Sequence, residues 1–362
     1  MDFILLSFFT ALIIVIMSTP ALIKVAKLKH LVDEPSESRK LHQNSVPTIG
    51  GVIIFLAFVF SVAIWFPTKS RLYYEFYAEL LQAIQEYKYL MASLVVLFFI
   101  GLKDDIIGVS PVKKLIAHMV VAFILVIMAD VRIVSMHGLF GMDLLPYWAS
   151  ILLSGFTYIV VVNAYNLIDG IDGLAAGVGI VTTLFFTTWF YLGGNVPLAV
   201  FSAAMAGALI GFLVFNFSPA KIFMGDSGSL VVGLVICVLS IRMIEFDGEY
   251  LPVRLQQVST PVLVMAVLSY PLIDTLRVFI LRSIKGNSPL LPDKNHIHHQ
   301  LLKKGLSHRQ TSLVVIIFSI LIIFLAIMLS PLPPTYEFLI LFLVVLLLVQ
   351  IPYFFFNSKK VK

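Results

Sequence analysis

A stretch between two apolar runs, NAYNLIDGIDG, places two amides and two carboxylates at every third position. These residues are Asn163, Asn166, Asp169 and Asp172. On a helix, this spacing keeps neighbouring side chains within about 5–6 Å of one another. Two ionised carboxylates at that separation repel each other by roughly 3 kcal/mol at an effective dielectric constant near 20. A cation is therefore expected among them.

Four further polar clusters interrupt the apolar sequence. They are DEPSESRKLHQNSVPTIGG at 33–51, LKDDIIGVSPVKK at 102–114, FNFSPAKIFMGDSGS at 215–229 and PDKNHIHHQLLKKGLSHRQ at 292–310. Their ionisable residues include Asp104, Asp105, Lys114, Lys221, Asp226, His296, His298 and His299. The chemistry must explain why carboxylates, lysines and histidines occur together.

Phosphoryl transfer is the chemistry that suits this combination, although carboxylates alone would repel a phosphate. Mg²⁺ prefers oxygen ligands and usually bridges one or two carboxylates to substrate phosphates. The glycine-rich turns at 170–173 and 225–228 are expected to expose N–H groups to oxyanions. The close histidines are expected to donate to one phosphate, because a structural zinc site would require thiolates or closed tetrahedral ligation.

Several of these residues also have a simpler interpretation. Asp104 and Asp105 are equally well explained as solvated charges at a helix end, and HIHH as a solvated loop or an incidental metal tract. Asp169 and Asp172 fit that interpretation less well, because carboxylates flanked by apolar helices are costly and usually mark function. For Asp274 and Arg277 in PLIDTLRVF, we favour an ion pair that fixes the HIHH loop over direct substrate contact.

The elements that must position these residues are membrane helices. Of the 362 residues, 60% are hydrophobic and only 12% are charged, which excludes an ordinary soluble domain. The composition predicts an all-α polytopic membrane protein, with residues 1–362 forming a single domain. Apolar runs that could cross about 30 Å of hydrocarbon lie near 3–23, 49–67, 89–102, 115–130, 144–162, 174–192, 197–217, 228–243, 257–281, 311–330 and 336–356. About 11 transmembrane helices are therefore expected.

The distribution of basic residues predicts the orientation of these helices. With the N-terminus outside and the C-terminus cytoplasmic, 19 of the 25 Lys and Arg residues lie on the inner side. The same orientation places all five polar clusters there, which predicts an active site built from cytoplasmic loops. The net charge of +5 is explained by this topology, so no nucleic-acid partner is needed.

Three other segments carry smaller predictions. The sequence at 68–88 indicates an interfacial amphipathic helix on the outer side. Ala203, Gly207 and Gly211 have the four-residue spacing of close helix packing, within the chain or in a homodimer. The first apolar run is expected to be a retained anchor, because its basic residues follow it. The lone Cys237 excludes an intramolecular disulfide.

The order of motifs over residues 30–310 resembles a known enzyme family. RKLH…PTIGG, DD followed by K, NAYNLIDGIDGLA, FMGDSGSL and HIHH occur in the same order in the polyprenyl-phosphate N-acetylhexosamine-1-phosphate transferases. That family includes the bacterial phospho-N-acetylmuramoyl-pentapeptide transferases and the eukaryotic dolichyl-phosphate GlcNAc-1-phosphate transferase. The resemblance is strongest to the branch that begins O-antigen, enterobacterial common antigen or wall teichoic acid synthesis.

Two departures separate the sequence from the muramoyl-pentapeptide branch. Ile297 interrupts the histidines, which are typically consecutive there, and Gln43 stands about where that branch has a lysine. A pentapeptide substrate is therefore the alternative within the family. The resemblance implies transfer of a sugar 1-phosphate, foremost GlcNAc 1-phosphate, from a UDP-N-acetylhexosamine to undecaprenyl phosphate. UMP would be released at the inner (cytoplasmic) membrane of a bacterium.

The resemblance also implies a role for individual residues. Mg²⁺, or alternatively Mn²⁺, would be held by Asp226 and Asn166. The implied substrate contacts are Lys114, His296, His298 and His299 to phosphates, Asn216 and Phe223 to uracil, Asp169 and Asp172 along the nucleotide pocket, and Lys40 and His42 in the first inner loop. Asp104 and Asp105 would face the lipid phosphate, one of them as its base.

A cation- or proton-coupled secondary transporter is the alternative class of protein. Its membrane carboxylates are also functional. They should lie near the bilayer midplane on interrupted helices, whereas the carboxylates here gather at predicted inner helix ends. We therefore favour the transferase.

Overall fold

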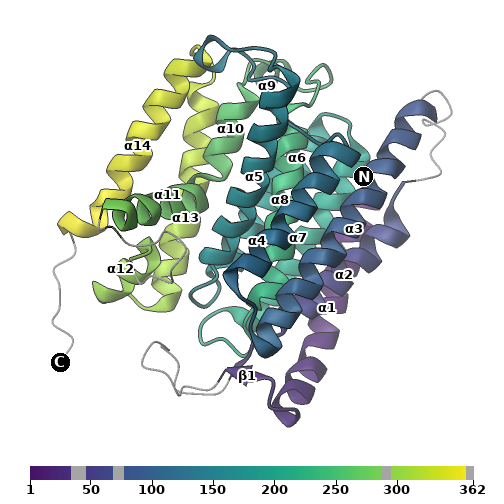
Figure 1. Cartoon of the computed structure of the whole chain (residues 1–362), viewed down its shortest axis with the longest axis vertical. Coiled ribbons are helices and arrows are strands. Elements are labelled where there is room, and N and C mark those ends of the chain that lie inside the picture. Colours follow the sequence, from purple (N-terminus) through teal and green to yellow (C-terminus); the bar gives the residue numbers. More distant parts are fainter. Residues whose placement is uncertain (34–45, 68–76, 285, 287–294, 356–362) are drawn as a thin grey trace.

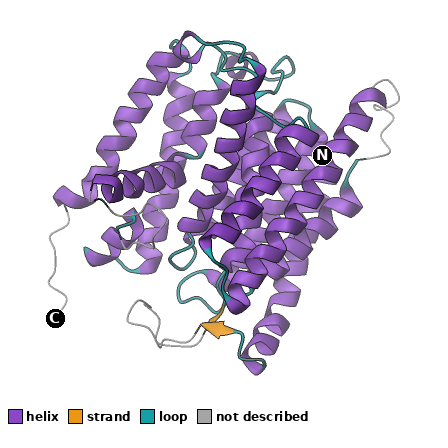
Figure 2. Cartoon of the chain, viewed as in Figure 1, coloured by secondary structure: helices purple, strands orange, loops and turns teal. Residues whose placement is uncertain are grey.

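The computed structural model describes residues 1–33, 46–67, 77–284, 286 and 295–355. Its helices are α1 (Asp2–Leu28), α2 (Gly50–Trp65), α3 (Tyr77–Ile107), α4 (Pro111–Phe123), α5 (Tyr147–Leu167), α6 (Leu174–Leu192), α7 (Val196–Asn216), α8 (Gly225–Ile244), α9 (Val253–Gln256), α10 (Thr260–Val267), α11 (Ser269–Ile284), α12 (Ile297–Lys303), α13 (His308–Leu329) and α14 (Pro334–Phe355). A π-helical turn, η2 (Ile124–Met128), extends α4, and a 3₁₀ turn, η3 (Leu139–Gly141), follows it. The short strands β1 (Val32–Asp33) and β2 (Val46–Pro47) pair antiparallel (Figure 2).

Each predicted apolar run overlaps a helix, because a helix satisfies its own backbone hydrogen bonds where no water is present. Among the described residues, seven helical segments are long and apolar enough to cross a membrane: α1, α4 with its extension, α5, α6, α7, α8 and α13. The bent pair α10 and α11 makes an eighth if it is one span, while Gly50–Trp65 and Pro334–Gln350 are apolar but shorter. The all-α polytopic prediction is confirmed.

Two predicted segments differ from the structure. The run at 257–281 is not one straight helix, because α10 and α11 meet at an angle of 73°. Pro271 lies at the start of α11 and has no N–H to continue the hydrogen-bond ladder. The described part of the predicted amphipathic helix, 77–88, belongs to α3. At 31 residues, α3 is about 46 Å long.

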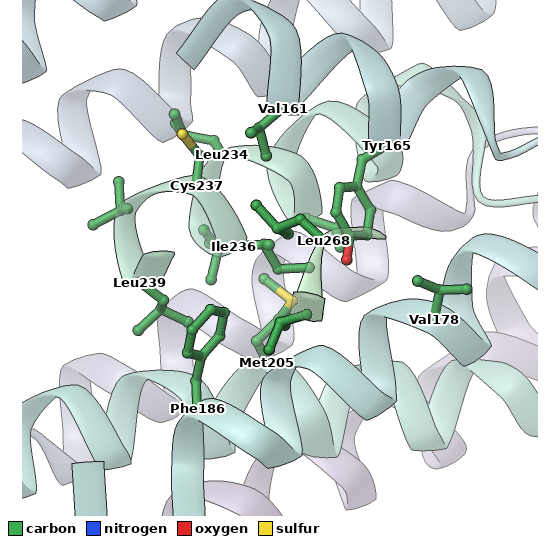
Figure 3. Packing of buried hydrophobic residues seen from close by; sticks show 14 of the residues in the cluster. Val161, Tyr165, Val178, Phe186, Met205, Leu234, Ile236, Cys237, Leu239 and Leu268 are labelled. Carbon is green, nitrogen blue, oxygen red and sulfur yellow. The ribbon is translucent and has the colours of Figure 1, made fainter. Parts of the chain in front are cut away.

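The helix α8 is the centre of the bundle. It packs against α2, α3, α5, α6, α7 and α10. Every residue of α8 except Gly225, Asp226 and Arg242 is buried. Figure 3 shows Leu234, Ile236, Cys237 and Leu239 of α8 near Val161 and Tyr165 of α5, Phe186 of α6, Met205 of α7 and Leu268. The position of the first turn of α8 is therefore fixed from all sides.

The small residues of α7 serve packing within the chain. A Cβ atom added to Gly207 would lie 2.1 Å from the carbonyl oxygen of Phe8, and one added to Gly211 would lie 2.9 Å from that of Leu12. These glycines allow the backbones of α1 and α7 to approach closely. The intrachain alternative for this spacing is thereby confirmed.

The polar clusters meet at one end of the bundle. Gly51 approaches Gly228, and His298 approaches Gly170, closely enough that a Cβ atom on either glycine would clash. The strands and α12 lie toward this end, and α9 lies at the opposite end (Figure 1). Met1 also belongs to the opposite end, because its sulfur lies 3.6 Å from the hydroxyl of Tyr191 near the end of α6.

The α1–α7 contact predicts a difference between two glycine substitutions. Gly207→Ala should destabilise the protein by about 1–3 kcal/mol, because the added methyl group meets backbone that cannot move aside alone. Gly155→Ala on α5 is the matched control, since nothing lies within 4 Å of its added Cβ atom. It should be neutral or stabilising by up to about 1 kcal/mol. Thermal unfolding in detergent checks both variants, and equal melting temperatures would contradict the packing role.

Candidate active site

The site is built around the first turn of α8, which two other helices approach through glycines. A Cβ atom added to Gly51 of α2 would lie 2.0 Å from the backbone nitrogen of Gly228. One added to Gly101 of α3 would lie 2.6 Å from the carbonyl carbon of Asp226. The start of α2 is also hydrogen-bonded to the segment before α8, with Gly51 N donating to the carbonyl of Met224 at 2.8 Å. Glycines at these positions therefore bring three backbones together beside Asp226.

The carboxylate of Asp105, near the end of α3, caps α8. Its Oδ1 accepts a hydrogen bond from the N–H of Asp226 at 2.7 Å, and its Oδ2 accepts one from the N–H of Ser227 at 3.0 Å. The positive end of a helix dipole favours a carboxylate at this position. These two N–H groups are occupied by Asp105, so the expectation that they face a phosphate oxyanion is wrong for this turn.

Lys114, on the first turn of α4, lies between two carboxylates. Its ammonium is 2.7 Å from Oδ2 of Asp104 and also donates to Oδ2 of Asp226. Asp104 is oriented by Val109, whose N–H lies 2.5 Å from Oδ1. The side chains of Asp104, Lys114 and Asp226 are 20%, 24% and 23% exposed, so a ligand can reach all three.

Asn166, in the last turn of α5, holds the other oxygen of Asp226. Its Nδ2 donates to Oδ1 of Asp226 and to the hydroxyl of Ser229, each at 2.9 Å. The Asn166 side chain therefore orients Asp226 through its nitrogen. Its Oδ1 makes no hydrogen bond to another described residue and is a neutral oxygen beside a carboxylate.

Of the four polar residues predicted to share a helix, only Asn163 and Asn166 lie on one. The helix α5 ends at Leu167, and the chain turns through 168–173 before α6 begins. Asp169 lies in this turn. Burial, followed by the charges of Asp226 and Asp105, raises the pKa of Asp169 to about 8. Asp169 therefore lies in a buried turn, close to two other carboxylates.

Asp172 and Asn216 are buried and bind backbone groups. Oδ2 of Asp172 accepts from the N–H of Ala220 at 3.1 Å. The amide of Asn216 accepts from Gly173 N at 3.0 Å and donates to the carbonyl of Ile222 at 2.9 Å. The N–H of Gly173 is thus also unavailable to an oxyanion. In this arrangement both side chains join the 168–173 turn to the segment between α7 and α8.

Asp274 and Arg277 of α11 bind the segment 295–299, which carries the three histidines and is called the histidine segment below. The fully buried carboxylate of Asp274 lies 2.9 Å from Nδ1 of His296 and accepts from the N–H of Ile297 at 2.7 Å. Arg277 donates to the carbonyl of Asn295 at 2.6 Å. Both contacts agree with the expectation that these residues fix the loop, and each side chain does so by binding the loop directly.

His298 faces the turn that carries Asp169. A Cβ atom added to Gly170 would lie 2.6 Å from Nε2 of His298. His296 and His298 are 3% and 0% exposed, so the solvated-loop alternative is wrong for both. Burial lowers the pKa of His298 to about 3. The ring is therefore neutral near pH 7 and can donate through only one nitrogen, with the hydroxyl of Tyr270 3.4 Å from Nδ1.

The remaining predicted residues occupy different positions. His299 and Phe223 are half-buried, and His299 lies beside His298 with ring centroids 4.3 Å apart. The backbone of Phe223 pairs with Pro47 and Gly50, which joins the segment before α8 to β2 and α2. Lys40 and His42 lie outside the described residues. Their predicted substrate contacts remain predictions.

The residues present fit a divalent cation held together with substrate phosphates. Within the described ranges, no group of three or more His, Cys, Asp or Glu side chains is arranged to hold a metal ion by itself. Mg²⁺ usually takes only one or two carboxylates and completes its shell with phosphates and water. Asp226, with the amide oxygen of Asn166 beside it, matches that smaller requirement.

Comparison with known proteins places this geometry in a family. Residues 87–244 match the model of glycosyl transferase family 4. The chain is 31% identical over 314 residues to a probable undecaprenyl-phosphate N-acetylglucosaminyl 1-phosphate transferase from Bacillus subtilis, with 86% of this chain and 81% of the relative covered. The chain belongs to glycosyl transferase family 4. The range that matches the family model includes Asp104, Lys114, Asn166 and Asp226.

Two other relatives are also named as polyprenyl-phosphate N-acetylglucosamine phosphate transferases. The chain is 35% identical over 322 residues to a decaprenyl-phosphate N-acetylglucosaminephosphotransferase from Mycobacterium tuberculosis, covering 84% of this chain and 77% of the relative. It is 28% identical over 331 residues to an undecaprenyl-phosphate alpha-N-acetylglucosaminyl 1-phosphate transferase from Escherichia coli K12, covering 88% and 83%. These alignments cover most of each chain, so the similarity is not confined to one motif.

Sequence reasoning missed several residues that shape the site. The amide of Asn166 donates to the hydroxyl of Ser229 as well as to Asp226, and the hydroxyl of Tyr270 contacts His298. Gly101 allows the backbone of α3 to approach the first turn of α8. The paired glycines in PTIGG were a usable signal, because adjacent glycines often mark a close backbone approach. No local signal distinguishes the capping role of Asp105, since it depends on a contact across 121 positions.

The geometry predicts that the adjacent aspartates differ on substitution. Asp105→Asn should destabilise the protein by about 1–3 kcal/mol, because one amide cannot accept from both N–H groups and its NH₂ would face a donor. Asp104→Asn should leave the melting temperature nearly unchanged while lowering turnover, since its carboxylate is partly exposed and contacts Lys114. Thermal unfolding and turnover of both variants check this difference. A stable Asp105→Asn variant would contradict the capping role.

Proposed function

We propose that this chain transfers GlcNAc 1-phosphate from UDP-GlcNAc to undecaprenyl phosphate and releases UMP. An oxygen of the lipid phosphate forms a bond to the phosphorus that bears the sugar, and the bond from that phosphorus to the oxygen of UMP breaks. One diphosphate linkage replaces another. The observation that carries the proposal is the Lys114 ammonium between Asp104 and Asp226 at the meeting point of the polar clusters. The names of the relatives support the same reaction.

The residues around Asp226 have different roles in binding the diphosphate. Asp226 and the Oδ1 of Asn166 would hold Mg²⁺, and Mn²⁺ is the alternative metal. When bound, the ion neutralises the diphosphate and stabilises the departing UMP. Lys114 is positioned to leave its carboxylate partners and bind a phosphate oxygen as the substrates enter. Asp105 positions this machinery by fixing the first turn of α8.

Asp104, rather than Asp105, is the member of the pair that faces the lipid phosphate. Both oxygens of Asp105 accept hydrogen bonds from backbone, whereas Asp104 is partly exposed beside Lys114. A phosphate monoester is already largely dianionic near neutral pH, since its second pKa is about 6. Asp104 therefore acts mainly by orienting Lys114 and the incoming phosphate, and removes a proton only from the monoanion.

The nucleotide and the sugar would lie toward the 168–173 turn and the histidine segment. Asp169, Asp172, Asn216 and Phe223 border the proposed nucleotide pocket. His298 is expected to act as a neutral donor from its Nε2 atom, which faces Gly170, with His296 and His299 beside it. Support for this arrangement is the close approach of the histidine segment to the turn that carries Asp169.

We also propose that about 11 helices cross the inner membrane of a bacterium, with the N-terminus outside and this site cytoplasmic. Support comes from the basic-residue bias and from the position of Met1 at the end of the bundle away from the site. A secondary transporter is disfavoured, because Asp104, Asp105 and Asp226 lie at helix ends instead of along an interrupted helix at mid-membrane.

The reaction is tested by incubating purified protein with undecaprenyl phosphate, Mg²⁺ and UDP-GlcNAc, UDP-GalNAc or a UDP-muramoyl-pentapeptide, and measuring UMP. We expect release with UDP-GlcNAc. Asp226→Asn should lower turnover at least about 100-fold, since loss of groups that merely support a metal ligand already costs 10–100-fold. Asn166→Ala should have a smaller effect that excess Mg²⁺ partly restores.

Two outcomes separate the proposed reaction from the proposed metal site. Folded wild-type protein that releases no UMP with any of the three donors would show that the reaction is wrong. Wild-type turnover and wild-type Mg²⁺ dependence in Asp226→Asn would show that the metal site is wrong while the reaction stands. Thermal unfolding of each variant provides the folding control.

The orientation is tested with single cysteines in a Cys237→Ala background. Ser110, between α3 and α4, and Tyr250, between α8 and α9, are exposed at opposite ends of the bundle. A membrane-impermeant maleimide should label Tyr250→Cys in intact cells, and Ser110→Cys only after permeabilisation. The reverse pattern would overturn the inner-face assignment.

A further inference from the structure

A cavity of about 520 Å³ lies at the end of the bundle opposite to Asp226, and we call it the distal cavity. Its size falls within the range of about 300–1,000 Å³ that is usual for small-molecule sites. It is lined by residues that include Trp189, Glu245, Phe246, Asp247, Gln257 and Ser259. The helix α8 begins at the candidate active site and ends beside Glu245. Because α8 has 20 residues, the two places are about 30 Å apart.

The walls of the distal cavity are held in place by hydrogen bonds between distant segments. Oε1 of Glu245 accepts from the N–H groups of Val134 at 2.7 Å and Ser135 at 3.2 Å. The side chain of Gln256 donates to the carbonyls of Glu249 at 3.0 Å and Leu251 at 2.8 Å. These bonds tie the segment between α8 and α10 to itself and to the segment after α4. The cavity is therefore largely formed before any ligand arrives.

Two aromatic side chains form rigid parts of the wall. Phe246 packs edge-to-face on Phe190, with ring centroids 5.7 Å apart, and lies against Gly193 so closely that a Cβ atom there would clash. Trp189 stacks on Phe185 with centroids 6.2 Å apart. Rigid aromatic walls bind a ligand at little cost in conformational entropy.

Two buried polar atoms of lining residues lack partners. Trp189 is 3% exposed and Ser259 is 8% exposed, and neither Nε1 of the indole nor Oγ of the serine has a hydrogen-bond partner among the described residues. Ser259 occupies the N-cap of α10, yet its hydroxyl does not cap the helix. Buried polar groups in folded proteins are normally satisfied, so the wall of the cavity holds two polar groups whose hydrogen-bonding capacity is unused.

The charges of the lining decide which ligands fit. The titratable side chains among the described lining residues are one histidine, His137, and two carboxylates, Glu245 and Asp247, with no lysine or arginine. Anions are therefore disfavoured. The amides of Gln256 and Gln257 add donors and acceptors beside the two aromatic rings. Aromatic faces combined with carboxylate, amide and hydroxyl groups suit a neutral molecule with an apolar face and many hydroxyl groups.

We propose that the distal cavity is a second binding site, for a neutral saccharide, on the face of the protein opposite to the transferase site. The site goes beyond the proposed reaction, because none of its lining residues touches the cluster around Asp226. A sugar ring places its apolar face against Phe246 while its hydroxyl groups reach the carboxylates and the amides.

Trp189 is a built-in reporter for this site. In a Trp65→Phe, Trp148→Phe background it is the one remaining tryptophan, since the chain has three. Titration of the purified protein with N-acetylglucosamine or maltose should change its fluorescence saturably. Glucose 6-phosphate should bind at least tenfold more weakly, because its charge meets Glu245 and Asp247.

Substitutions on one loop distinguish the distal cavity from other sites. Gln257→Phe places a ring in the cavity from an exposed position and should weaken saccharide binding at least tenfold. Glu249→Gln is the matched control, because its side chain is exposed and does not line the cavity; its binding should equal that of the parent. Thermal unfolding confirms that each variant is folded.

Three results would overturn the proposal. They are the absence of a saturable signal with either sugar in folded protein, unchanged binding in Gln257→Phe, and equally tight binding of glucose 6-phosphate or of Ca²⁺ alone. UMP release plays no part in these measurements. Failure of the saccharide site therefore leaves the transferase assignment untouched, and failure of the transferase assignment leaves this test valid.

Discussion

The carboxylate of Asp105, which accepts hydrogen bonds from the N–H groups of Asp226 and Ser227 in the first turn of α8, is the contact on which the site depends. It joins the end of α3 to the start of the most buried helix in the bundle, and so fixes where Asp226 stands. Gly51 and Gly101 permit this arrangement, because any side chain there would separate the backbones. Because the first turn of α8 is fixed, Lys114 and Asn166 each donate a hydrogen bond to one carboxylate oxygen of Asp226.

The surplus of carboxylates follows from this arrangement. A cap that carries a full negative charge stabilises the helix end, but it also brings Asp105 toward Asp226 and Asp169. Burial, together with the charges of Asp226 and Asp105, raises the pKa of Asp169 to about 8. The fold therefore concentrates negative charge where a divalent cation and the phosphates that accompany it would gather. Structural capping and the proposed affinity for a cation both follow from the same placement.

Much of the architecture was predictable because apolar length and backbone satisfaction decide it. Each apolar run overlaps a helix, and the polar clusters meet at one end as their alternation along the chain implied. The roles within the clusters were less predictable. Asp104 and Asp105 are identical neighbours in sequence. Only their contacts in the fold distinguish them, because Asp104 pairs with Lys114 of α4 and Asp105 caps α8. The histidines were expected to face phosphate as donors, but Asp274 draws His296 into the interior and His298 is neutral. The bend between α10 and α11 was hidden inside a single apolar run.

The distribution of the site along the chain limits how small a working version of this protein can be. The contacts begin at Gly51, which precedes the range that matches the family model, and reach His298, which follows it. A fragment confined to 87–244 would keep Asp104, Lys114, Asn166 and Asp226. It would lose the backbone of α2 at Gly51, which packs against α8, and the imidazole of His298, which packs against Gly170. The family model matches only the middle of the chain, yet the proposed site is not confined to that range. It is a property of nearly the whole bundle, so trimming either end of the chain should abolish it.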